Sequence, residues 1–262
     1  MRGRSTPLGD NFDSVRRRFT NSPFGNIVFH AQTASTNEDA FARFDDAESG
    51  GLTIVADHQT AGRGRKGRPW IASPGSSLLF TTILPRAFPR QHLWTLPFWT
   101  GLCVWEALRH LGFATLLQWP NDLLLQSRKC CGILCVSRVT GETALVGCGV
   151  GLNVQRTAIE PEAITPPPSY LSDVRHIDRA TVLAEILSRF SDDFWLLDHP
   201  RQVARRWERA AGLPGKVYRL QVDNSAQSME ASAQKLGPSG ELIVSENGTT
   251  RLIGLADARV IR

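Results

Sequence analysis

The stretch of the chain best suited to chemistry runs from Gln59 to Trp70 and reads QTAGRGRKGRPW. It contains four cations and three glycines, a composition that suits neither a helix nor an ordinary strand. Glycine lets a backbone approach a ligand closely, and guanidinium groups match the oxygens of phosphate or carboxylate. We therefore predict an anion-binding loop that is mobile when empty and ordered when an anion arrives. Composition alone also allows a solvated tract or a nucleic-acid contact.

The distribution of charge favours the first of these interpretations. The net charge is +5 over 262 residues. The first 22 residues hold five arginines against two aspartates and the loop adds four cations, so the rest of the chain is slightly acidic. Such local positive charge argues for a focused anion site and against a protein coated for nucleic-acid binding.

The cysteines and the apolar runs limit the class of protein. Five cysteines are an odd number without framework spacing, and no histidine stands near Cys130, Cys131 and Cys135 to complete a zinc site. We expect reduced thiols packed as small hydrophobic side chains. No apolar run reaches the roughly 18 residues of a membrane span, and no apolar signal core follows Met1. These patterns predict a cytoplasmic protein without membrane contact.

Three further patches carry polar groups that could serve a ligand. Ser35-Thr36-Asn37-Glu38 has the pattern of a helix capping box, but its hydroxyl and amide groups could also receive a ligand. Trp119-Pro120-Asn121-Asp122 is a turn that could present its last two side chains. Lys129 precedes Gly132, and a glycine within a strand suggests close approach to the backbone. A structural role alone remains possible for each patch.

The flanking segments would position these groups. Strands are predicted at Asn26–Ala31, Leu52–Asp57, Ser77–Leu84 and Ala144–Val154, so the loop is pinned at both ends. Apolar residues at helical spacing predict core helices from Leu93 to Leu108, Thr181 to Leu197 and Val203 to Ala211. The glycines of 144–154 do not form a dinucleotide fingerprint, and no P-loop pattern occurs.

The two ends of the chain have a different character. Residues 1–22 read as a polar, flexible N-terminal arm that is too short for a helix-turn-helix domain. From Lys216 the period becomes two, in Val217–Val222, Met229–Leu236, Leu242–Ser245 and Arg251–Ile261, with Asn247-Gly248 as a hairpin turn. We expect five short strands that form a small barrel packed on the larger domain.

Four patches together resemble the biotin protein ligase family. GRGRKGRPW, WPND, KCCGIL and GVGLNV occur in that family's order and approximate spacing, and the resemblance extends from about Ser35 to the C-terminus. It implies an α/β (α+β) fold: a mixed-sheet catalytic domain over 23–213, like class II aminoacyl-tRNA synthetase and biotin ligase cores, and an SH3-like β-barrel over 214–262. It implies the type without an N-terminal DNA-binding domain, and it argues against a nucleic-acid role for the loop.

The resemblance also implies roles for individual residues. Ser35, Thr36, Asn37 and Gln59 match positions that bind the head group of biotin. Arg63, Gly64 and Arg65 match the loop over the acyl-adenylate, and Trp70 matches its aromatic lid. Lys129 matches the lysine that reaches the biotin carboxylate and the α-phosphate, with Arg65 as its catalytic partner. Asn153 matches the amide that faces adenine, while Asn121 and Asp122 match the nucleotide and magnesium region, with Asp122 as the metal ligand.

The implied reaction has two steps, with biotin and ATP as substrates and Mg²⁺ as cofactor. Biotinyl-5′-AMP forms first, and the biotinyl group then passes to a lysine of the biotin carboxyl carrier protein of acetyl-CoA carboxylase or a related carboxylase. The resemblance implies a monomer or homodimer that does not bind DNA. One departure is Gln118, where the family usually has lysine before WPND. If this position faces phosphate, we expect Gln118→Lys to leave ATP binding equal or tighter.

Two other functions fit parts of the pattern. A lipoyl or octanoyl ligase or transferase shares the general fold, although the GRGRKG loop and the barrel favour biotin. A non-catalytic sensor of biotin or the adenylate is conceivable because of Gln118 and the basic arm. Transfer of labelled biotin to a carrier domain separates all three.

Overall fold

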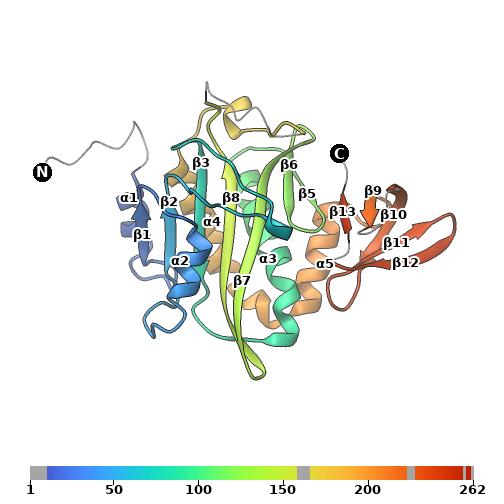
Figure 1. The fold of residues 1–262 in the computed structure, drawn as a ribbon, viewed down its shortest axis with the longest axis horizontal. Coiled ribbons are helices and arrows are strands. Elements are labelled where there is room, and N and C mark those ends of the chain that lie inside the picture. Colours follow the sequence, from blue (N-terminus) through green and yellow to red (C-terminus); the bar gives the residue numbers. More distant parts are fainter. Residues whose placement is uncertain (1–10, 158–165, 223–227, 256–257, 261–262) are drawn as a thin grey trace, which may run out of the picture.

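The larger part of the protein is built on a mixed sheet of eight strands. The computed structural model describes residues 11–157, 166–222, 228–255 and 258–260. The strand order is β1-β2-β3-β8-β7-β6-β5, with the short β4 also paired to β8 (Figure 1). Only the pair β1 and β2 is parallel among these neighbours. The strands are β1 (Ile27–His30), β2 (Thr53–Ala56), β3 (Ser77–Ile83), β4 (Phe88–Pro89), β5 (Thr115–Gln118), β6 (Asp122–Leu125), β7 (Arg128–Thr140) and β8 (Thr143–Asn153).

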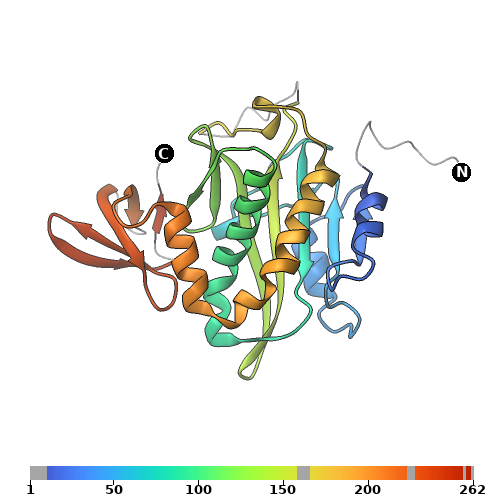
Figure 2. The ribbon, with the colours of Figure 1, turned by 180° about the vertical axis from the view of Figure 1, so that it is seen from behind.

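Three helices cover one face of this sheet, as Figure 2 shows. They are α3 (Leu96–His110), α4 (Arg179–Asp193) and α5 (Pro200–Ala211). Their apolar stripes meet in the core, where Trp99 lies 4.7 Å from Phe190 between ring centroids. The predicted helices are confirmed, with shifted ends. The 3-10 turns Arg90–Thr95 and Phe194–Asp198 flank α3 and α4, and Pro200 starts α5 because proline suits the first turn of a helix.

The opposite face of the sheet carries the short helix α2 (Thr36–Ala42) and the loop 59–70. In Figure 1 this loop crosses in front of β8 and β7. It leaves β2 and returns to β3, as the two predicted strands require. The loop is therefore held against the centre of the sheet by its own flanking strands.

The N-terminal arm differs from its prediction where it is described. Residues Phe12–Arg18 form the helix α1, whose N-cap Asn11 accepts a hydrogen bond from the amide of Ser14. Phe12, Val15 and Phe19 are buried, and the ring of Phe12 stacks on Phe29 at 5.3 Å. Three apolar residues in eight positions make too short a stripe to stand out among arginines, which is why the sequence suggested a flexible arm. Residues 1–10 lie outside the described residues.

The C-terminal part forms a second, antiparallel sheet of five strands, which confirms the expected number. Its order is β12-β11-β10-β9-β13, with β9 (Val217–Val222), β10 (Ser228–Leu236), β11 (Leu242–Glu246), β12 (Thr249–Ile253) and β13 (Ala258–Val260). Asn247 and Gly248 both have positive φ, as a tight hairpin turn requires. This sheet is as expected for an SH3-like domain. The domain limits 1–22, 23–213 and 214–262 stay predictions.

Direct contacts join the second sheet to the first. The ammonium of Lys216 donates to the carbonyl of Leu117 at 2.8 Å, and the indole of Trp119 donates to the carbonyl of Gly240 at 3.3 Å. Burial lowers the pKa of Lys216 because the charged ammonium loses hydration. The small sheet therefore rests on β5 and on the turn that follows it.

Among the described residues, no helix has the combined length and apolar character needed to cross a membrane. All five cysteines are free, and four are fully buried. Burial raises the pKa of Cys131, so its thiol is unreactive and serves as packing, as predicted.

Candidate functional site

A cavity of about 610 Å³ opens between the loop 59–70 and the sheet. The residues proposed above for biotin, nucleotide and metal binding all line it, and they come from the start of α2, the loop, the turn after β5, and the strands β6, β7 and β8. Five cationic side chains and a single carboxylate belong to its described lining. This excess of positive charge favours an anionic ligand.

Glycines form the floor of the cavity. A side chain at these positions would collide with neighbouring atoms. A Cβ on Gly149 would come 2.2 Å from Oδ1 of Asn37, and one on Gly151 would come 2.7 Å from the ring of Trp70. A Cβ on Gly132 would lie 2.9 Å from the same ring. The predicted close approach to Gly132 is therefore confirmed, and the approaching group is an indole.

Hydroxyls and amides gather at the polar end of the cavity. The backbone amide and hydroxyl of Thr36 both donate to Oε1 of Gln59, at 2.8 and 3.0 Å. Nδ2 of Asn37 donates to the carbonyl of Leu134 at 3.1 Å. Ser35 is the N-cap residue of α2, but its side chain makes no capping bond and lines the cavity instead. The capping-box interpretation is therefore wrong, and these groups are oriented toward the cavity.

The loop has a defined path over the cavity. The amide of Gly64 donates to the carbonyl of Arg68 at 2.7 Å, and that of Trp70 donates to Gly62 at 2.8 Å. A 3-10 turn at Arg65–Gly67 forms the tip, with Lys66 and Gly67 at positive φ. Glycine tolerates this conformation without strain. The ordering of the loop on ligand binding stays a prediction.

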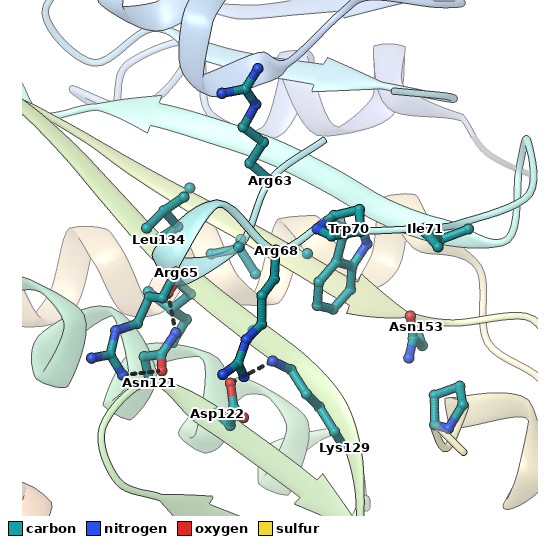
Figure 3. A pocket seen from close by; sticks show the side chains of 18 of the residues that line it. Arg63, Arg65, Arg68, Trp70, Ile71, Asn121, Asp122, Lys129, Leu134 and Asn153 are labelled. Carbon is teal, nitrogen blue, oxygen red and sulfur yellow. Dashed lines mark hydrogen bonds and ion pairs between the residues drawn. The ribbon is translucent and has the colours of Figure 1, made fainter. Parts of the chain in front are cut away.

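The cations of the loop point in different directions, as Figure 3 shows. The exposed Arg63 points away from the group formed by Arg65, Asn121 and Lys129. Arg65 donates to Oδ1 of Asn121 at 3.3 Å and also to the backbone carbonyl of Leu255, in the C-terminal part. Arg65 therefore joins the loop, the turn after β5 and the second sheet.

An ion pair marks the charged end of the cavity. Nζ of Lys129 lies 2.7 Å from Oδ1 of Asp122, and 5.5 Å from the ring centroid of Trp70. Nδ2 of Asn121 donates to the carbonyl of Ile133 at 2.7 Å. These contacts fix the lysine between a carboxylate and an aromatic face, with its charge at the cavity.

Asn153 lies apart from this cation cluster, at the end of β8 (Figure 3). It accepts a bond from the hydroxyl of Ser77 and donates to the carbonyl of Ser169, both at 3.3 Å. Its contact with adenine stays a prediction.

Arg68 and Tyr170 are among the cavity-lining residues that sequence reasoning missed. Arg68 points in Figure 3 toward the Asp122–Lys129 pair, although only Arg63 and Arg65 were singled out among the loop arginines. Its membership of the same cationic tract was a sufficient signal. Tyr170 also lines the cavity, but it follows a proline-rich loop and belongs to no recognised motif, so the sequence carried no signal for it.

Gln118, the residue that departs from the family pattern, lies beside the cavity and not in its described lining. Gln118 is in register with Asp122, but β5 is the last strand of its sheet, so this residue lies one strand farther out. It is only 6% exposed and is not part of the described lining of the cavity. The presence of glutamine in place of lysine at position 118 therefore leaves the five cations of the described lining unchanged.

The segment that carries Tyr170 is held by a charged contact. The guanidinium of Arg156 donates to Asp173 from Nε at 2.8 Å and from Nη2 at 3.0 Å, and the amide of Tyr170 donates to Oδ2 at 2.9 Å. The hydrogen bonds from Arg156 lower the pKa of Asp173 below its ordinary value of 3.8. The stability that this contact contributes is thus fully present above pH 3.8. It is lost as the pH falls through the lowered pKa of Asp173 in the folded protein.

Asp173→Asn should lower the free energy of unfolding by about 2 kcal/mol at pH 7, because it removes a charged acceptor with three donors. The difference from wild type should shrink below pH 3.8. Urea unfolding at pH 7 and pH 3 measures both values. Asp192→Asn is the control, because its carboxylate is 63% exposed and lies 3.8 Å from Arg189. An Asp173→Asn protein as stable as wild type at pH 7 would contradict this account.

The donor set allows a magnesium ion only with help from a ligand. No group of three or more potential metal-binding side chains occurs among the described residues. Asp122 is the single carboxylate of the described lining, and Asn121 adjoins it. Mg²⁺ commonly binds through one or two carboxylates together with substrate phosphates and water. Asp122 therefore fits a metal that arrives with a nucleotide.

Comparisons with known proteins agree on one family. Residues 29–153 match the model of the biotin/lipoate A/B protein ligase family. The chain is 30% identical to a biotin–[acetyl-CoA-carboxylase] ligase of Mycobacterium tuberculosis over 244 residues, covering 88% of each chain. It is 33% identical to the bifunctional ligase/repressor BirA of Salmonella typhimurium, covering 87% of this chain and 72% of that protein. The biotin protein ligase of Aquifex aeolicus, solved in complex with biotin and ATP, is 25% identical and has a TM-score of 0.72. The match covers 91% of this chain and 100% of that chain.

Proposed function

We propose that this chain, which belongs to the biotin protein ligase family, forms biotinyl-5′-AMP from biotin and ATP and transfers biotin to a lysine of a carboxylase carrier protein. It is an ATP-dependent ligase. The observation that carries the proposal is the two-ended cavity, with neutral donors and acceptors over a glycine floor at one end and a group of cations that includes Arg65, Arg68 and Lys129 at the other. Such a cavity suits a neutral, polar head group joined to a negatively charged phosphate.

We assign the polar end to the head group of biotin. Ser35, Thr36, Asn37 and Gln59 surround this end with hydroxyls and amides. The ureido group of biotin has two N–H donors and one carbonyl acceptor, so it requires partners of both kinds. The glycine floor lets the flat bicyclic ring lie against the backbone of the sheet.

In the first half-reaction, an oxygen of the biotin carboxylate attacks the α-phosphorus of ATP, and pyrophosphate leaves with the electron pair of the broken P–O bond. Negative charge grows on the phosphate oxygens during this step. Lys129 and Arg65 are assigned to stabilise that charge, and Arg68 of the same loop is a third candidate. Fixed charges of this kind act strongly in a site from which water is excluded.

In the second half-reaction, the ε-amine of the carrier lysine attacks the carbonyl carbon of the mixed anhydride. The amide bond forms, and AMP leaves with the electrons of the C–O bond. The loop has to cover the anhydride until the carrier arrives, since water would hydrolyse it. We assign Trp70 and Asn153 to contacts with the nucleotide.

Magnesium is proposed as the cofactor on the chemistry of the donor set. Asp122, with Asn121 beside it, would hold the ion together with the nucleotide phosphates, where it would neutralise phosphate charge. Because Asp122 also pairs with Lys129, its carboxylate holds the lysine in place in either case.

We also propose the carrier, the oligomeric state and the cellular location. The carrier belongs to acetyl-CoA carboxylase or a related carboxylase. We expect the ligase to act as a monomer or homodimer, in the cytoplasm and without DNA.

Incubation with labelled biotin, Mg-ATP and a carboxyl-carrier domain tests the proposal. We expect label on the carrier, dependent on ATP and absent when the target lysine of the carrier is replaced by arginine. Adenylate without transfer would indicate a sensor instead, and efficient use of lipoate in place of biotin would indicate a lipoyl ligase. Either result would overturn the proposed function.

A further inference from the structure

A buried hydroxyl outside the cavity holds two of the groups at its polar end. Thr81 lies on β3, is fully buried and is not part of the described lining of the cavity. Its hydroxyl is 2.9 Å from Oγ1 of Thr36 and 2.8 Å from Oδ1 of Asn37. We propose that Thr81 is a positioning residue that sets the affinity and selectivity of the polar end for the head group of the substrate. The inference rests on the proposed function, since it takes that head group to be the ureido ring of biotin.

The register of three strands puts Thr81 under Asn37. Thr81 pairs with Gly149 of β8, and Gly149 pairs with Leu134 of β7, so the three residues form one row across the sheet. The side chain of Asn37 lies over this row. It accepts from Thr81 at one end, fills the space above Gly149, and donates to the carbonyl of Leu134 at the other end.

The hydrogen-bond directions leave Asn37 one favourable orientation. Nδ2 must face the carbonyl of Leu134, because a carbonyl can only accept. Oδ1 then faces Thr81, which supplies a proton. Without the hydroxyl of Thr81, Oδ1 of the part-buried Asn37 would lose this donor, which is costly. The side chain of Asn37 would then turn to another partner and leave its place at the cavity.

The same hydroxyl also contacts the residue that orients Gln59. Oγ1 of Thr81 lies 2.9 Å from Oγ1 of Thr36, although its single proton is used by Oδ1 of Asn37. The backbone amide of Thr36 donates to Oε1 of Gln59, which leaves Nε2 of Gln59 as a donor beside Gly62. A donor at this place matches a ligand carbonyl, such as that of a ureido group. Thr81 therefore orients Asn37 directly and supports Thr36, which orients Gln59.

The test compares wild type with Thr81→Val, which has the same shape without the hydroxyl. Thr81→Ser keeps the hydroxyl, and Thr82→Val is the matched control. Thr82 is the next residue of β3, is equally buried, and its hydroxyl pairs with that of Thr53 at 2.9 Å. Since successive residues of a strand point to opposite faces, Thr82 does not contact the polar end. Thr81→Ala removes the same hydroxyl and replaces Thr81→Val if the latter does not fold.

Steady-state kinetics should show a KM for biotin about tenfold higher in Thr81→Val, with the KM for ATP within twofold of wild type. Thr81→Ser and Thr82→Val should both keep the wild-type KM for biotin, even if Thr82→Val melts earlier. Preference for biotin over 2-iminobiotin, which lacks the ureido carbonyl, should also fall in Thr81→Val. A merely structural role would not produce this selectivity change.

Three results would overturn the inference: an unchanged KM for biotin in Thr81→Val and Thr81→Ala, an equal rise in Thr82→Val, or a rise in Thr81→Ser. Failure of the proposed function is seen separately, since the wild-type protein would then not use biotin in the same assay.

Discussion

Lys129→Met should reduce the rate of adenylate formation by roughly a hundred- to a thousandfold, as expected when a fixed charge is removed from a developing anion. The side chain is about a third exposed and is held between Asp122 and the ring of Trp70. Methionine keeps much of the length of the side chain but supplies neither charge nor hydrogen bond. The ammonium should therefore matter most when phosphate charge grows, and binding of biotin alone should change less.

Biotin-dependent exchange of pyrophosphate with ATP measures this first half-reaction without a carrier. Lys235→Met is a suitable control, because Lys235 is an exposed residue of β10 outside the described lining of the cavity. It should exchange at the wild-type rate. If Lys129→Met did so as well, Lys129 would have no part in the chemistry.

Gly149→Ala should weaken biotin binding by roughly a hundredfold, the upper part of the usual cost of overpacking a tightly packed place. The added methyl would lie 2.2 Å from Oδ1 of Asn37 and 2.6 Å from the carbonyl of Leu134. The carbonyl belongs to the backbone of β7 and cannot turn aside, so the Asn37 side chain must leave. Calorimetry with biotin in the absence of ATP measures this effect directly.

Two other glycines provide matched comparisons for Gly149→Ala. Gly101→Ala adds a methyl in α3 at ordinary contact distances of 3.4 Å from Ile133 and 3.5 Å from Leu117, so stability and biotin affinity should be retained. Gly151→Ala meets chiefly the ring of Trp70, which is a side chain and can move, so it should affect biotin less than Gly149→Ala. Wild-type biotin affinity in Gly149→Ala would contradict the geometry of the polar end.

The sequence was informative wherever residue types act locally. The cationic, glycine-rich loop, the turn at Trp119-Pro120 and the strands on either side were all predictable, because glycine, proline and periodic apolar residues constrain their own backbone. Five strands at the C-terminus were predicted for the same reason, whereas the mixed sheet was implied by the family resemblance. The short helix α1 was missed because its three buried apolar residues stand among arginines.

What the sequence could not supply was the register between distant strands. Thr81 is 68 residues from Gly149 and 53 from Leu134 in the numbering of the chain, yet the three form one row under Asn37. A buried threonine in an apolar strand gives no local sign of such a role. The same limit applies to Gln118, since whether its side chain reaches the cavity depends on the place of β5 at the edge of the sheet.

The bridge made by Arg65 has a thermodynamic consequence for the C-terminal sheet. One guanidinium binds the turn residue Asn121 and the carbonyl of Leu255, while its own backbone belongs to the loop over the cavity. Linkage is reciprocal, so a ligand that favours this arrangement of the loop favours docking of the C-terminal sheet by the same coupling free energy by which docking favours that ligand. Undocking of that sheet would in turn loosen the loop, and the fidelity with which the anhydride is retained would depend on residues about 190 positions away along the chain.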